Sequence, residues 1–105
     1  MLRRNRFGDL VRRQLDLFED DTRALLAEAA EADAAWTKAG REDSEELYGD
    51  YQLVVDEIAE RLFDVREAYA ATLDARAVDE YRAAFNRAAS KRFRRYTTLL
   101  DDETT

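Results

Sequence analysis

The fold is decided by residues 43–73, which read DSEELYGDYQLVVDEIAERLFDVREAYAATL. Large apolar side chains recur there every three or four residues, which places them on one face of a helix. They are Leu47, Tyr51, Val54, Val55, Ile58, Leu62, Val65, Tyr69 and Leu73. Asp43 followed three residues later by Glu46 fits a pair that caps a helix start. The stretch predicts one long amphipathic helix over 44–73.

A second helix is predicted over residues 6–39. Its apolar stripe runs through Phe18 and Leu25 and covers nearly half of the helix circumference, which is wider than one neighbouring helix can bury. The predicted helix stops at Gly40, a residue type that adopts the left-handed conformation without steric cost. Two neighbours are therefore needed to cover this helix.

A third helix is predicted over residues 75–100, with Asp74 as its cap. The connections between the three helices are short, so consecutive helices should be antiparallel neighbours. We therefore predict an all-α protein with one domain over 6–100, an up-down-up bundle of three long helices. A long hairpin of the first two helices, completed as a coiled coil by a second chain, is the alternative.

Composition supports a helical chain without strands. The 105 residues contain no proline and three glycines, so the turns that an all-β fold requires are missing. We expect helix in more than about three-quarters of the chain. Residues 1–5 are predicted to form a frayed basic arm, and residues 101–105 an acidic disordered tail.

The residues that most enzymes rely on are absent. The chain has no cysteine and no histidine, which removes thiolate nucleophiles, imidazole bases and the usual metal ligands. No glycine-rich phosphate loop and no Gly-x-Ser-x-Gly motif occurs. We expect a protein that is not an enzyme and carries no cofactor.

Carboxylates at helical spacing leave weak divalent-metal binding as an alternative. One candidate set is Glu28 with Glu31, and the other is formed by Asp56, Glu57, Glu60 and Asp64. Both sets lie mainly opposite the apolar stripes, so we expect a solvated acidic face instead. No apolar run is long enough for a transmembrane segment or follows the basic start as a signal peptide would, and we expect a cytoplasmic location.

Basic residues gather at both ends of an acidic chain. The net charge is −7, yet residues 1–13 hold five arginines against one aspartate, and residues 87–96 hold five cations and no acid. Candidate anion-binding residues are Arg3, Arg4, Arg6, Arg87, Lys91, Arg94 and Arg95. The sequence favours the interpretation that the cations near the C-terminus pair with the chain's own acids across the bundle. The candidate acids are Glu28, Glu31, Asp50, Asp56 and Glu57.

Several apolar residues and one arginine indicate a partner surface. Leu10 and Leu17 lie on one edge of the wide stripe, while Leu53 and Phe63 lie on the acidic side of their helix. Arg92 interrupts the apolar stripe of the third helix, so it should extend past the core to solvent, form a buried pair with an acid such as Glu28, or meet a second subunit's carboxylate.

The core is small for one subunit, because only 23 residues are Leu, Ile, Val or Phe. We therefore predict a homodimer or larger assembly. The leading functional interpretation is a structural or interaction module that self-associates or docks on a protein partner through apolar helix faces. A small regulatory protein that binds nucleic acid or a nucleoprotein through its arginine-rich ends is the alternative, and weak metal binding is a third.

Overall fold

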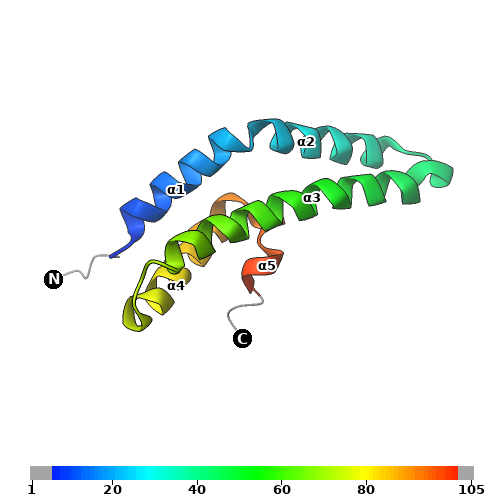
Figure 1. Cartoon of the computed structure of the whole chain (residues 1–105). Coiled ribbons are helices and arrows are strands. Elements are labelled where there is room, and N and C mark those ends of the chain that lie inside the picture. Colours follow the sequence, from blue (N-terminus) through cyan, green and yellow to red (C-terminus); the bar gives the residue numbers. More distant parts are fainter. Residues whose placement is uncertain (1–5, 102–105) are drawn as a thin grey trace.

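The computed structural model describes residues 6–101, and over that range it contains helices and no strand (Figure 1). Helix accounts for 88% of it, which confirms the predicted all-α class. The helices are α1 (Gly8–Asp21), α2 (Arg23–Lys38), α3 (Arg41–Ala70), α4 (Ala75–Arg92) and the short α5 (Thr98–Asp101), with a single 3₁₀ turn, η1 (Arg94–Tyr96), before α5. The arm predicted over 1–5 and most of the tail predicted over 101–105 lie outside the described residues, but Asp101 is the last residue of α5.

The continuous helix predicted over 6–39 is instead two helices joined at Thr22. The Thr22 hydroxyl donates a hydrogen bond of 2.6 Å to the backbone carbonyl of Phe18, and the side chain is buried. Bonding of this kind to the preceding turn bends a helix. Thr22 accordingly leaves helical geometry, with φ −108° and ψ 18°. On the N-terminal side of this bend, α1 diverges from α3 (Figure 1).

The helix predicted over 44–73 runs from Arg41 to Ala70, three residues earlier at both ends. Gly40 caps its start in an extended conformation with φ −75°, so the predicted left-handed glycine and the predicted cap at Asp43 are both wrong. Asp43 lies in the first turn, where its charge favours the positive end of the helix dipole. The predicted cap at Asp74 is confirmed, since its carboxylate accepts hydrogen bonds from the backbone amides of Arg76 and Ala77.

The helix predicted over 75–100 ends early, at Arg92. Phe93 turns the chain with φ −131° and ψ 48°, and its buried ring packs edge-on against Phe18 with 5.2 Å between ring centroids. The turn brings η1 and α5 back onto α3 and leaves Leu100 with no exposed surface. Burial of Phe93 and Leu100 thus prevails over the continuous helix that local propensity favours.

The helices form a three-helix bundle at one end of the molecule and a two-helix hairpin at the other. The chain measures 56 × 26 × 25 Å along its principal axes. α2 lies along α3, α1 packs mainly against α4, and α4 covers only the second half of α3 (Figure 1). The predicted three-long-helix bundle therefore holds only in part.

The core lies where α1, α3 and α4 meet. Its largest fully buried apolar side chains are Val11, Leu15, Ile58, Leu62, Tyr81, Phe85 and Leu100. At the far end of the hairpin a separate aromatic cluster joins α2 to α3, with Trp36 stacked on Tyr51 and tilted against Tyr48.

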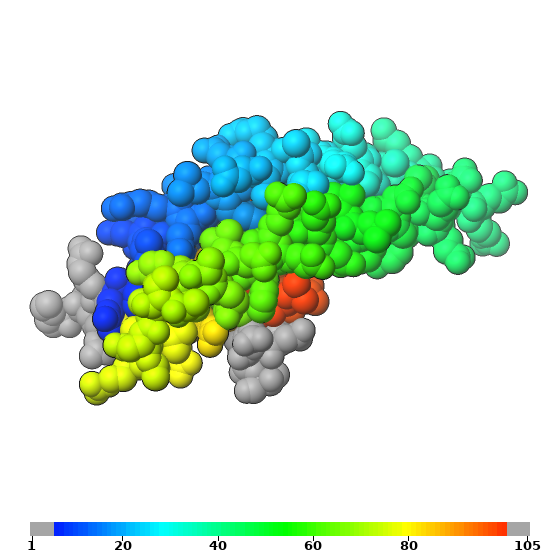
Figure 2. Space-filling view, viewed as in Figure 1, coloured from blue at the N-terminus to red at the C-terminus, as the bar shows by residue number. Residues whose placement is uncertain are grey.

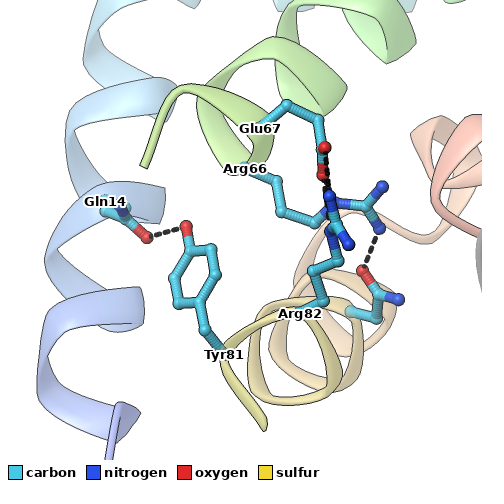
Figure 3. A network of polar contacts seen from close by, with 6 residues as sticks. Gln14, Arg66, Glu67, Tyr81 and Arg82 are labelled. Atoms are coloured by element: carbon cyan, nitrogen blue, oxygen red, sulfur yellow. Dashed lines mark hydrogen bonds and ion pairs between the residues drawn. The ribbon is translucent and has the colours of Figure 1, made fainter. Parts of the chain in front are cut away.

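A fully buried arginine crosses the core between α3 and α4 (Figure 3). Arg66 has no exposed surface. Its guanidinium donates one hydrogen bond from Nε to Glu67 and one from Nη1 to Asn86, each 2.8 Å long. Arg82 binds the same Glu67 carboxylate through two hydrogen bonds, of 2.6 and 3.0 Å. Hydrogen bonding by Arg82, opposed by burial and reinforced by Arg66, lowers the pKa of Glu67.

Candidate interaction surface

A groove opens between α1 and α3 on the side of these helices that α4 does not cover. On the face shown in Figure 2, α1 and α2 lie beside α3 and no other helix crosses over them. The groove forms where α1 bends away at Thr22 and encloses about 350 Å³. It is lined by Gln14, Leu17, Phe18, Asp21 and Thr22 from α1 and the bend, and by Arg61, Asp64 and Val65 from α3.

The floor of the groove is apolar and well supported. Phe18 is only 3% exposed, and Val65 packs against the core from the opposite wall. The side chain of Gln14 is fixed by α4, because its carbonyl oxygen accepts a 2.8 Å hydrogen bond from the Tyr81 hydroxyl (Figure 3). Leu17 stands at the edge with 62% of its surface exposed, so the groove presents a large aliphatic side chain to solvent beside a fixed floor.

The rim of the groove is acidic. Asp21 on the α1 side and Asp64 on the α3 side form no ion pair with any residue of the described range. Arg61 also lines the groove, but its guanidinium pairs with Glu57 at 3.1 Å on the same helix. The carboxylates of the two walls therefore dominate the charge at the groove.

The predicted partner-binding residues do not form one surface. Leu17 lines the groove, and Leu53 is 70% exposed on the outer, acidic side of α3, as the sequence pattern predicts. Leu10 is half-buried and packs against the core. The exposure predicted for Phe63 is wrong, because Phe63 is half-buried against the core with the Arg66 guanidinium 5.1 Å from its ring centroid.

Arg92 is not buried. It extends past the core to the edge of α1, where it pairs with two carboxylates. Its guanidinium lies 2.7 Å from Asp16 and 2.8 Å from Glu19, both on α1, and about a third of its side chain is exposed. The hydrogen bonds that Arg92 donates to the carboxylates of Glu19 and Asp16 raise the pKa of Arg92. The buried pair with Glu28 is therefore wrong, and the carboxylates come from this chain. Among the arginines of residues 6–101 the buried one is Arg66. The apolar stripe of its helix did not single it out, although it follows Leu62 by four residues.

Those predicted anion-binding residues that lie within residues 6–101 fall into two groups, paired and unpaired. Arg6 lies 3.7 Å from Glu80, and Arg95 pairs with Asp33 at 3.1 Å while it also donates to the Tyr51 hydroxyl. Arg3 and Arg4 lie outside the described residues. The remaining cations, Arg87, Lys91 and Arg94, are exposed, and within residues 6–101 none of them lies in an ion pair. The acids expected to pair with the cations of the third helix are thus not the ones used, and three of these cations form no ion pair with a carboxylate of the described residues.

The acidic side chains of α2 and α3 do not converge. Across the described range, no three metal-ligating side chains come close enough together to hold an ion. Within that same range, none of the helices has both the length and the apolar character needed to cross a membrane.

Comparison of the chain with protein-family models, curated proteins and solved structures finds no match.

Proposed function

We propose that the protein is a non-catalytic helical interaction module that docks on a second polypeptide through the groove between α1 and α3. The observation that carries this proposal is Leu17, which stands 62% exposed beside a groove of about 350 Å³ with an apolar floor. A monomer gains nothing from exposing a large aliphatic side chain next to a preformed apolar concavity, whereas an interface buries both.

The arrangement of the helices supports the same proposal. α1 and α3 lie side by side on the open face, and helical partners commonly fill the groove between two such helices. Burial of the 62% of Leu17 that is exposed would contribute about 1–2 kcal/mol to an interface.

Photo-crosslinking at Leu17 tests the proposal. A photoreactive phenylalanine derivative replaces Leu17 in cells that naturally make the protein, and a matched variant carries it at Ala83, which is exposed on α4. We expect a defined adduct from position 17 and none from position 83. Adducts from both positions, or from neither, would contradict docking at the groove.

The mass of the adduct separates the two forms of the proposal. An adduct of twice 12.2 kDa indicates a second copy of the chain, and any other mass indicates another protein. Sedimentation equilibrium over low to high micromolar concentration gives an independent measure of self-association. A single 12.2 kDa species throughout, with cooperative melting, would exclude the predicted homodimer but leave docking on another protein open.

Nucleic-acid binding is a second candidate, and the free cations of α4 and η1 favour it. Arg87, Lys91 and Arg94 lack an ion-pair partner anywhere in residues 6–101, so they are available to phosphates. The net charge of −7 opposes it, because an acidic protein repels nucleic acid at long range.

Fluorescence anisotropy with a labelled single-stranded oligonucleotide tests this candidate across a salt series. A variant with glutamine at Arg87, Lys91 and Arg94 should lose binding, while one with glutamine at Arg13, Lys38 and Arg41 loses the same charge elsewhere and should retain it. Binding that changes equally in both variants would reflect net charge and not a site.

A further inference from the structure

We propose that the groove between α1 and α3 receives a basic amphipathic helix of a partner protein. This inference rests on the proposed docking function and specifies the chemistry of the partner. Its apolar side chains would lie on Phe18 and Val65 beside Leu17, and its lysines or arginines would meet Asp21 and Asp64.

The shape of the site favours a helix as the occupant. The walls of the groove are two adjacent helices, α1 and α3, and α4 packs against the other side of the same pair. A helix laid along the groove would complete a four-helix arrangement in which the added helix packs against both α1 and α3. Apolar residues at three- and four-residue spacing on such a helix would reach the floor together.

The charge at the rim selects a basic partner. One carboxylate stands on each wall, Asp21 on α1 and Asp64 on α3, and neither is neutralised within residues 6–101. Glu60 extends the acidic strip along the outside of α3 next to Asp64. A helix with cations on both flanks of its apolar stripe would satisfy both walls, while an acidic helix would be repelled.

The same charges disfavour a second copy of this chain as the occupant. In a two-fold symmetric pair, the same patch of both subunits meets, so Asp21 and Asp64 of both copies would come together with only two Arg61 side chains, each of which already pairs with Glu57. Like charges placed against each other cost stability and suppress association.

The test uses model peptides with the full-length protein. The probe is a fluorescein-labelled 16-residue peptide with leucine at heptad positions a, d and e and lysine elsewhere; the comparison peptide has glutamate in place of every lysine. Fluorescence anisotropy at physiological salt measures binding of each. We expect the lysine peptide to bind at least about tenfold more tightly than the glutamate peptide.

Two double variants separate a local effect of the rim from net charge. Asp21→Asn with Asp64→Asn removes the rim carboxylates and should weaken binding of the lysine peptide about fivefold. Asp50→Asn with Glu31→Gln removes two exposed acids of the hairpin and should leave binding unchanged. Thermal melting of each variant confirms that it is folded, and Leu17→Ala supplies a further loss of binding that involves no change of charge.

Each outcome decides the matter. Equal weakening by both double variants, or equal binding of both peptides, would overturn the basic-helix inference while docking at Leu17 could still stand. A protein that sediments as a dimer and becomes monomeric with Leu17→Ala would assign the groove to a second copy and overturn it as well. Absence of the Leu17 adduct in the crosslinking experiment would instead overturn the docking function itself.

Discussion

Replacing Asn86 should destabilise the protein more than replacing the buried arginine that it supports. Arg66 is 0% exposed, and its guanidinium has three nitrogens to satisfy. Nε donates to Glu67 and Nη1 to Asn86, but the buried Nη2 has no hydrogen-bond partner. Without Arg66 the Glu67 carboxylate would still have a partner, because Arg82 donates two hydrogen bonds to it.

The magnitudes follow from which group each substitution leaves unpaired. Asn86→Leu leaves a second nitrogen of a buried cation without an acceptor, and should lower the free energy of unfolding by about 1.5–3 kcal/mol. Arg66→Met removes the incompletely bonded cation but leaves the Asn86 oxygen unpaired, so the two effects should cancel to within about 1 kcal/mol. The double variant leaves no polar group unpaired, and should be as stable as the natural protein or up to about 4 kcal/mol more stable.

Urea unfolding followed by far-ultraviolet circular dichroism measures all four proteins. The double variant should recover at least about 1.5 kcal/mol relative to Asn86→Leu alone, at an unchanged dependence on urea. A double variant less stable than Asn86→Leu would show that the Arg66 network stabilises the fold, and would refute the reasoning.

Three further predictions concern the core and its titrating groups. Phe18→Ala should cost about 3–5 kcal/mol of unfolding free energy, since Phe18 is 3% exposed and packs on Phe93; the half-buried Leu25→Ala should cost less, and equal melting temperatures for both would contradict the core assignment. Because the pKa of Glu67 is lowered, its ionised carboxylate stabilises the fold at pH values above the ordinary pKa of 4.5. This contribution is lost as the pH falls through the lowered pKa. Glu67→Gln should therefore weaken the dependence of the unfolding free energy on pH in the acid range. Burial raises the pKa of Tyr81 to about 12 from 10.0. The stability contributed by its neutral hydroxyl should therefore be lost as the pH rises from 10.0 to about 12. In Tyr81→Phe, a spectrophotometric titration of the tyrosines should lose its most alkaline component.

Local pattern was sufficient for the class of fold and for most helix positions. Helical periodicity and capping depend on residues a few positions apart, so the long helix around Ile58 and the cap at Asp74 could be predicted before any neighbour was known. The exposed position of Leu53 could be predicted in the same way, since it lies off the centre of its apolar stripe. The same reasoning fails for Phe63, which is half-buried against the core.

Only tertiary structure decided where the helices bend and which polar residues are buried. Whether Thr22 bends a helix or Phe93 ends one depends on the burial of each side chain among residues distant in sequence. Two arginines on apolar faces, Arg66 and Arg92, are equivalent in periodicity, yet Arg66 is sealed beneath α4 and Arg92 reaches Asp16 and Glu19 at the edge of α1. Periodicity places a residue on a face of its own helix, but the neighbouring helix determines whether that face meets water, a carboxylate or the core.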